Sequence, residues 1–362
     1  MAPSPEARWK TFPAMVRRND GASLLVRAPN WIGDAVMCLP ALEAAHRGQP
    51  DSAITVLAKP WVASVFRSNP AVTAVMEYDA RGRHGGIVGR WRLAGDIRRR
   101  FGRALLFQNA FEAALIAFLA RIPERYGYTT DGRGLLLTNG VKPPGKGTLY
   151  HHVDYYLDLV EKAGMGRRGT QLPRLYLEES EIAWGRKFLR DRGGDAASPL
   201  IGIAPGAAYG PAKQWPAERF AQAAALLSRE RPLYPLLFGS RGDSEACRRV
   251  GDGIGTASLD LSGQTSLREA MALMSLCAVF ITNDSGLMHV AAALGVPTVA
   301  IFGSTDPDRT GPLGERCAVL YKKVDCSPCF KRDCPTDFRC MESISADDVA
   351  ESAMKLIGVR GE

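Results

Sequence analysis

The sequence contains no run of eighteen apolar residues, so no segment is expected to cross a membrane as a helix. The first twenty residues lack the apolar core of a secretion signal, because charged residues and prolines interrupt them. No recognised nucleic-acid-binding module accompanies the basic residues of the chain. We therefore expect a cytoplasmic protein that does not bind nucleic acid, with a flexible N-terminal tail over residues 1–20.

The composition is that of an ordinary globular protein, with 46% hydrophobic and 23% charged residues. A chain of 362 residues is too long for one ordinary hydrophobic core, so two domains are expected. Residues 178–199 predict an amphipathic helix followed by a connector rich in Gly, Ser and Pro. We place the domain boundary near residues 180–198, which gives an N-terminal domain at 21–190 and a C-terminal domain at 198–362.

Short apolar runs alternate with stretches of helical length in both halves of the chain. This alternation predicts parallel sheets covered by helices, the doubly wound α/β class. In the first half the expected strands are 23–28, 54–57, 72–76 and 104–107. In the second half they are 201–204, 233–238, 258–261, 278–281 and 297–302. Helices are expected to begin at Glu218, Asp243 and Ser266, where Ser266 and Glu269 match a capping box.

The stretch 277–306 reads as a strand, a turn, a short helix and a second strand, with the turn sequence TNDSG. Asp284 is expected to be the N-cap of the helix. The free N–H groups of Ser285 and Gly286 would then face outward and favour an anion, such as a diphosphate. The alternative is an ordinary capped helix with no ligand. His289, one turn later, either points to a ligand phosphate or ribose or packs on the preceding strand.

Two further features lie at turns that follow strands. Asp34 comes after the first strand, in a glycine turn, where its carboxylate is positioned for chemistry or only caps a helix. Lys213 lies in a glycine-rich loop, PGAAYGPAKQWP, after the strand 201–204. Its charge would neutralise phosphate, although a single loop lysine is often merely exposed.

The net charge of +8 is unevenly distributed. Residues 1–178 hold 25 Lys and Arg against 15 Asp and Glu, whereas the remainder holds 21 against 23. The basic residues could form a solvated helix face, a nucleic-acid surface, or a site for an acidic lipid or phosphorylated saccharide. The nucleic-acid surface is disfavoured because no recognised binding module accompanies the charge. The basic residues are concentrated between positions 81 and 103: Arg81, Arg83, Arg90, Arg92, Arg98, Arg99, Arg100 and Arg103.

Four of the eight cysteines lie within fifteen residues of one another, in a loop at 326–340. In a cytosolic chain this spacing favours metal binding over disulfides, with structural Zn²⁺ ahead of an iron–sulfur cluster. Reduced thiols or disulfides remain the alternatives. The four candidate ligands are Cys326, Cys329, Cys334 and Cys340.

Four segments in sequence order resemble the lipopolysaccharide heptosyltransferases of glycosyltransferase family nine: GDAVMCLPAL, PGAAYGPAKQWP, FGSRGDSEAC and TNDSGLMHVAAALGVPTVAIFGSTDP. The resemblance extends over residues 23–357. It implies a GT-B fold, in which two Rossmann-like domains face each other across a cleft. The first domain would take a lipid-anchored inner-core acceptor at the cytoplasmic face of the inner membrane, and the second would take ADP-L-glycero-D-manno-heptose.

The same resemblance assigns roles to particular residues. Asp34 matches the family's general base, and Lys213 matches its phosphate-binding lysine. Asp284, Ser285, Gly286 and His289 match the donor-site turn, and either Asp243 or Glu245 would contact the adenosine. The chain has Ala207 and Ala208 where some relatives have hydroxyl side chains, so backbone groups would have to contact the phosphate there.

The implied reaction is an inverting transfer of heptose to the first heptose of the inner core. The alternatives are heptosyltransferase I, another ADP-sugar transferase of the same fold, or a non-catalytic protein that binds a sugar nucleotide or lipid. No Asp-x-Asp pair occurs in a donor-binding setting, so no catalytic metal or other cofactor is expected.

Overall fold

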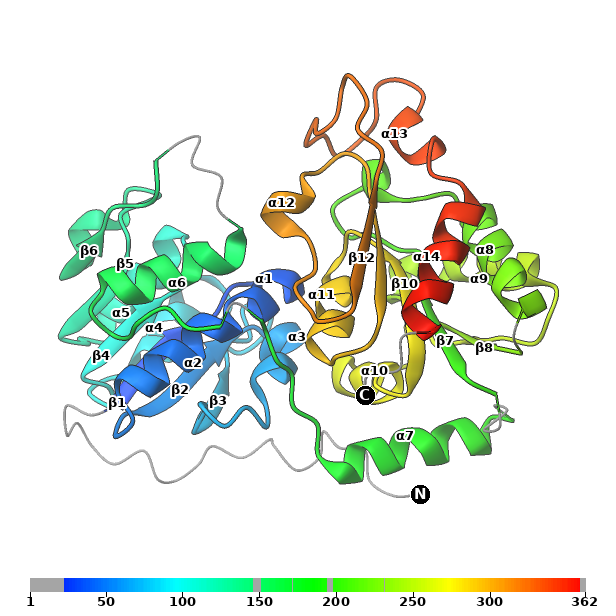
Figure 1. The fold of residues 1–362 in the computed structure, drawn as a ribbon. Coiled ribbons are helices and arrows are strands. Elements are labelled where there is room, and N and C mark those ends of the chain that lie inside the picture. Colours follow the sequence, from blue (N-terminus) through cyan, green and yellow to red (C-terminus); the bar gives the residue numbers. More distant parts are fainter. Residues whose placement is uncertain (1–22, 146–150, 171, 194–197, 231, 359–362) are drawn as a thin grey trace. The chain divides into compact units, whose positions relative to one another are not determined.

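The computed structural model describes residues 23–145, 151–170, 172–193, 198–230 and 232–358. The chain divides into two compact units, Met1–Tyr176 and Leu177–Glu362. Each unit contains one six-stranded sheet with helices around it (Figure 1). The tail predicted over residues 1–20 lies outside the described residues.

The first unit has the strand order β3-β2-β1-β4-β5-β6, and all neighbouring strands are parallel. Its strands are β1 (Ser23–Arg27), β2 (Ala53–Ala58), β3 (Ala74–Glu77), β4 (Arg103–Leu106), β5 (Glu124–Tyr128) and β6 (Asn139–Val141). Its α-helices are α1 (Ile32–Met37), α2 (Leu39–Gly48), α3 (Pro60–Ala63), α4 (Gly86–Ile97), α5 (Phe111–Leu119) and α6 (His152–Lys162).

The second unit has the order β12-β11-β10-β7-β8-β9, again with every neighbouring pair parallel. Its strands are β7 (Leu200–Ala204), β8 (Tyr234–Leu237), β9 (Leu259–Asp260), β10 (Cys277–Asn283), β11 (Thr298–Phe302) and β12 (Cys317–Tyr321). Its α-helices are α7 (Glu179–Asp191), α8 (Ala217–Glu230), α9 (Ser244–Ile254), α10 (Leu267–Met274), α11 (Gly286–Ala293), α12 (Pro307–Thr310), α13 (Arg339–Glu342) and α14 (Ala346–Gly358).

All nine predicted strands are present, with ends shifted by a few residues. Three further strands were not predicted, because each lacks a buried apolar run. β5 has the polar sequence ERYGY, β6 has only three residues, and β12 is a partly exposed edge strand. A fully buried strand such as β7 gives a much stronger signal, since parallel strands are covered on both faces.

Helix α7 belongs to the second unit, whereas the sequence placed residues up to 190 in the first domain. The reason is a buried, bidentate ion pair between α7 and α10. Arg268 donates to Glu181 through Nε at 2.5 Å and through Nη2 at 2.6 Å. The compact unit therefore begins at Leu177, and residues 194–197 of the predicted connector lie outside the described residues.

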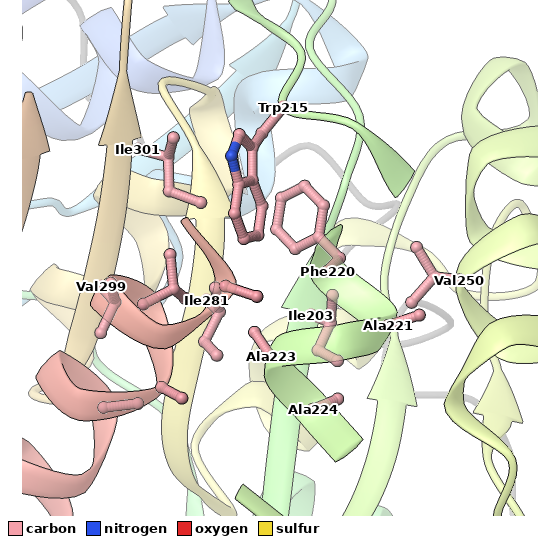
Figure 2. Packing of buried hydrophobic residues seen from close by; sticks show 14 of the residues in the cluster. Ile203, Trp215, Phe220, Ala221, Ala223, Ala224, Val250, Ile281, Val299 and Ile301 are labelled. Carbon is pink, nitrogen blue, oxygen red and sulfur yellow. The ribbon is translucent and has the colours of Figure 1, made fainter. Parts of the chain in front are cut away.

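The core of the second unit lies between its sheet and the helices that cover it (Figure 2). Trp215 packs edge-on against Phe220 of α8, with ring centroids 4.9 Å apart. The Trp215 indole also donates to the carbonyl of Ile344 at 3.1 Å. A fully buried aromatic residue therefore fixes the end of the loop that follows β7.

Each sheet reverses its strand order once, between β1 and β4 in the first unit and between β7 and β10 in the second. In open parallel sheets, ligands bind outside the carboxyl ends of the strands at this reversal. Asp34 follows β1, Lys213 follows β7 and Asp284 follows β10. The three candidate residues are therefore positioned by topology at the two places where this fold class binds ligands.

Candidate active site

Asp34 lies in the first turn of α1, and it is not the cap of that helix. The N-cap is Trp31, and its side chain makes no capping hydrogen bond. The Asp34 carboxylate instead faces helix α6, where Tyr156 Oη donates to Oδ1 at 3.4 Å. His152 Nδ1 lies 3.4 Å from the same oxygen. The carboxylate thus faces the polar side chains of α6 and does not cap its own helix.

Sequence reasoning missed His152 and Tyr156. Burial raises the pKa of the Tyr156 phenol, and the charge of Asp34 raises it further, so this hydroxyl stays protonated as a donor. The sequence carried no signal for the pairing, because more than a hundred residues separate α6 from Asp34 and only the sheet topology brings them together.

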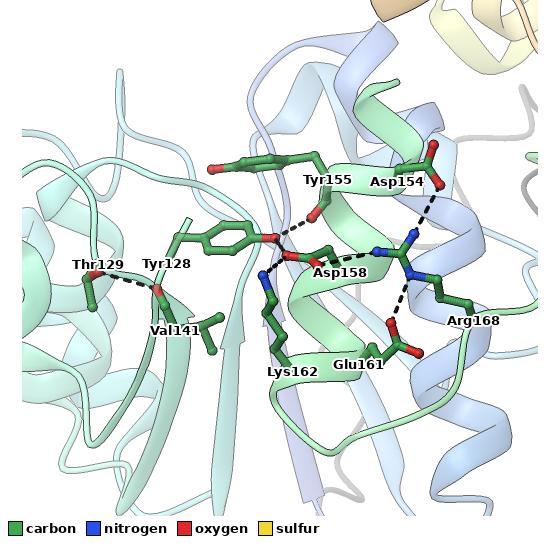
Figure 3. A network of polar contacts seen from close by, with 9 residues as sticks. All are labelled: Tyr128, Thr129, Val141, Asp154, Tyr155, Asp158, Glu161, Lys162 and Arg168. Atoms are coloured by element: carbon green, nitrogen blue, oxygen red, sulfur yellow. Dashed lines mark hydrogen bonds and ion pairs between the residues drawn. The ribbon is translucent and has the colours of Figure 1, made fainter. Parts of the chain in front are cut away.

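A network of charged residues fixes α6 in this position (Figure 3). Tyr128 at the end of β5 donates to Asp158 of α6 at 2.8 Å and to the backbone carbonyl of Tyr155 at 2.7 Å. Lys162 and Arg168 both pair with Asp158, at 2.8 and 3.3 Å. This buried carboxylate therefore ties α6, the helix that carries His152, to β5 of the sheet.

In the second unit, Asp284 is not the N-cap of α11, and that prediction was wrong. Ser285 occupies the cap position, with φ −145° and ψ 171° and no side-chain capping bond. Asp284 Oδ2 instead accepts from Lys213 Nζ at 2.5 Å and from Thr305 Oγ1 at 2.6 Å. Its carboxylate is drawn away from its own helix because two other loops supply stronger donors.

The Lys213–Asp284 pair is almost buried, with side chains 15% and 5% exposed. It brings the loop after β7 against the turn after β10. The pair holds the ammonium group beside the start of α11, where backbone N–H groups have no partner within the helix. Positive charge and free donors at one point are what a phosphate group requires.

Asn283, the last residue of β10, is a second residue that sequence reasoning did not single out. Its Oδ1 accepts from the backbone N–H of Trp215 at 3.0 Å, and its Nδ2 donates to the carbonyl of Pro205 at 2.7 Å. One fully buried amide therefore pins both ends of the loop that carries Lys213. The sequence shows Asn283 in the TNDSG turn, but it does not show that the side chain contacts the loop after β7.

The other predicted donor residues have different surroundings. Asp243 caps the turn Arg241–Asp243 by accepting from Ser240, and it also lies directly against Gly206 in the Lys213 loop. Glu245 is an exposed residue of α9 that pairs with Arg248 at 2.7 Å. His289 is buried within α11. Of the two acidic candidates, only Asp243 adjoins the loop.

The cysteine-rich loop packs on the same site. Tyr209 Oη donates to the carbonyl of Phe330 at 2.8 Å, and the N–H of Ala212 donates to the carbonyl of Arg332 at 3.1 Å. A Cβ on Gly210 would lie 2.5 Å from that Arg332 oxygen, so only glycine allows so close an approach. The cysteine-rich loop therefore packs directly against the loop that carries Lys213.

The four cysteines of this loop lie near one another. Burial raises the pKa of the Cys340 thiol, and the nearby Cys326, Cys334 and Cys329 raise it further. Within the residues that the structure describes, no three His, Cys, Asp or Glu side chains gather in a way that could hold a metal ion. The predicted metal therefore stays a prediction.

A cluster of cations lies at the carboxyl ends of β1 and β2 in the first unit. Arg27 and Lys59 are both buried, and Lys59 Nζ lies 3.4 Å from the ring centroid of Tyr78. Glu112 accepts from Tyr78 at 2.5 Å and from Arg90 at 2.6 Å. Over the described ranges, no carboxylate forms an ion pair with Arg27 or Lys59.

The protonation of this cluster reflects its burial. Desolvation lowers the pKa of Lys59 to about 8, and the neighbouring charge of Arg27 contributes to the drop. Desolvation likewise lowers the pKa of Arg27 to about 10. Two buried cations with one shared carboxylate nearby leave excess positive charge, which favours an anionic ligand.

The sequence of this chain is similar to those of known glycosyltransferases. A model of glycosyltransferase family 9 (heptosyltransferase) matches residues 90–338. Lipopolysaccharide heptosyltransferase 2 of Salmonella typhimurium is 34% identical over 316 residues, which are 83% of this chain and 90% of the relative.

Two solved structures are similar over almost the whole chain. Escherichia coli ADP-heptose lps heptosyltransferase II has a TM-score of 0.77 and 28% identity, covering 92% of this chain and 98% of the other. A family 9 glycosyl transferase of Veillonella parvula has a TM-score of 0.82 and 26% identity, covering 93% and 97%.

Two doubly wound parallel sheets match the GT-B heptosyltransferase structure, so the predicted fold class is confirmed, and the family match makes the protein a glycosyltransferase. The chain belongs to glycosyltransferase family 9, the heptosyltransferases. The family resemblance seen in the sequence is thereby confirmed. No helix within the described ranges is long and apolar enough to cross a membrane.

Proposed function

We propose that this chain is an inverting heptosyltransferase that transfers L-glycero-D-manno-heptose from ADP-heptose to the first heptose of the lipopolysaccharide inner core. The relatives named heptosyltransferase 2 support this step and do not favour a non-catalytic binding protein. The observation that carries the proposal is the Lys213–Asp284 pair at the start of α11, a site suited to a diphosphate.

The chemistry is a single displacement at the anomeric carbon. Asp34 takes the proton of the acceptor hydroxyl as its oxygen bonds to the anomeric carbon, while the bond to the diphosphate breaks and ADP leaves. Negative charge grows on the leaving diphosphate, and Lys213 with the N–H groups of Ser285 and Gly286 would stabilise it. Attack opposite the leaving group inverts the anomeric centre.

The first unit would bind the acceptor. The acceptor is anionic and carries a lipid anchor, which fits the excess positive charge of the two buried cations Arg27 and Lys59. Peripheral contact with the cytoplasmic face of the inner membrane belongs to this proposal, because the lipid anchor holds the acceptor there. Asp243, beside the Lys213 loop, is the acidic residue best placed to contact the adenosine.

The test uses purified protein, ADP-heptose and acceptors that carry zero, one or two heptoses. Release of ADP should be fastest with the acceptor that carries one heptose. Release with the heptose-free acceptor alone would assign the preceding transfer step. No release with any verified acceptor would contradict the enzymatic proposal.

A structural metal in the cysteine-rich loop has no part in this mechanism. Zinc bound by Cys326, Cys329, Cys334 and Cys340 would hold the loop as one wall of the donor site. The purified protein should then contain about one metal ion per chain, and Cys326→Ser together with Cys329→Ser should remove it. A metal-free active protein would contradict the prediction.

A further inference from the structure

Helix α4 (Gly86–Ile97) has two apolar faces, and only one of them is covered. Gly89, Leu93, Ala94 and Ile97 are buried against the first unit. On the other side, Ile87 and Val88 are each 72% exposed and Trp91 is 59% exposed. These three residues fall at positions i, i+1 and i+4, so they form one continuous face. We call them the α4 face.

The chain around the α4 face is strongly basic. Residues 81–100 contain seven arginines and a single acidic residue, Asp96. Arg83 pairs with Asp96 at 2.9 Å, and Arg92 donates to the backbone carbonyl of Arg83 at 3.0 Å. The exposed apolar residues therefore lie in a stretch of chain in which arginines greatly outnumber carboxylates.

Other exposed aromatic residues lie at the same edge of the sheet. Trp31, Trp61 and Phe111 are 63%, 44% and 43% exposed, and they follow β1, β2 and β4. The guanidinium of Arg81 lies 5.5 Å from the Trp61 ring centroid. Helix α4 follows β3, so its first turn starts at this carboxyl edge too, which is the edge of Asp34.

We propose that the α4 face inserts into the surface of a bilayer that contains anionic phospholipids, and so docks the first unit beside its acceptor. Apolar and tryptophan side chains suit the boundary between headgroups and acyl chains, and arginines attract anionic headgroups. A second copy of the chain is a poor occupant, because a symmetric contact would bring two arginine clusters together. The link to an acceptor rests on the proposed function, whereas the lipid contact does not.

The test is co-sedimentation of the full-length protein with vesicles of phosphatidylcholine, with and without phosphatidylglycerol. Binding should require phosphatidylglycerol and weaken as salt is added. A variant with Ile87→Ser, Val88→Ser and Trp91→Ser should bind the vesicles at least about tenfold more weakly than the parent protein. Leu135→Ser is the matched control, because Leu135 is a 96% exposed apolar residue of the same unit that lies outside the α4 face.

Activity separates this inference from the proposed function. The triple variant should act normally on a delipidated acceptor and slowly on an acceptor embedded in vesicles. Vesicle binding by the parent protein that the triple variant loses, without turnover of any acceptor, would support the lipid contact and contradict the enzymatic proposal. Equal vesicle binding by parent and triple variant, or a parent dimer that the triple variant abolishes, would overturn the lipid contact.

Discussion

The residue that separates catalysis from structure is Asp34. Because Trp31 is the N-cap, Asp34→Asn leaves the helix start intact and removes only the proton acceptor. We expect kcat to fall roughly a hundred- to ten-thousand-fold, with unchanged affinity for ADP-heptose, measured by ADP release and calorimetry. Tyr156→Phe is the matched control, since it removes one contact of the carboxylate and not the carboxylate itself. Near-normal turnover of a folded Asp34→Asn protein would exclude it as the base.

Lys213 should matter more in the transition state than in the ground state, because charge on the diphosphate grows as the sugar leaves. Lys213→Ala should lower kcat/KM by a factor that corresponds to a loss of about 2–4 kcal/mol of transition-state stabilisation. The alanine variant also leaves Asp284 buried without its cation, so Lys213→Arg is needed as a control that keeps the charge. An alanine variant as active as the parent would reduce this lysine to a structural ion pair.

Lys59 should give the proposed acceptor site a pH dependence. Its pKa in the folded protein is about 8, below the value of 10.5 in an unfolded chain. The buried charge is therefore present below pH 8 and lost above it, and stability gains as pH rises from 8 towards 10.5. The KM for an anionic acceptor should rise above pH 8 in the parent and be flat in Lys59→Met. Identical pH profiles for the two proteins would exclude Lys59 from acceptor binding.

Among the elements, the loop after β7 depends on a single amide at the end of β10. Asn283→Ala removes both bonds that hold the ends of this loop and leaves the N–H of Trp215 and the carbonyl of Pro205 without their partner. We expect a stability loss of about 1–3 kcal/mol and weaker binding of ADP. Asn283→Asp should retain the bond from Trp215 and lose the bond to Pro205. Unchanged ADP affinity in the alanine variant would show that the loop holds its shape without Asn283.

At the scale of the whole molecule, the Glu181–Arg268 pair attaches α7 to the second unit. Both partners are buried, so Glu181→Ala removes the carboxylate that neutralises the Arg268 guanidinium inside the second unit. Its unfolding free energy should drop by about 3–5 kcal/mol in denaturant titrations that follow that unit. Glu179→Ala, an exposed neighbour on the same helix, should change little. A chain of residues 177–362 should likewise be more stable than one of residues 198–362. Equal stabilities would show that α7 is only a linker and does not stabilise the second unit.

The sequence by itself determined the fold class, nine of the strands and the family. Buried parallel strands and the glycine turns between them are local patterns that can be seen in one segment at a time. The positions of Asp34, Lys213 and Asp284 after strands were local in the same sense. The structure then places these three residues at the strand reversals, because the strand order is that of a doubly wound sheet.

Only the tertiary structure decided which side chains meet. Asp284 looked like a helix cap in isolation, yet Lys213 and Thr305 take its carboxylate from 71 and 21 residues away. His152 and Tyr156 reach Asp34 because α6 returns beside α1, and the α4 face is exposed because its opposite side already fills the core. A hydrogen bond depends on distance in space, and the order of strands in a sheet sets that distance where sequence spacing does not.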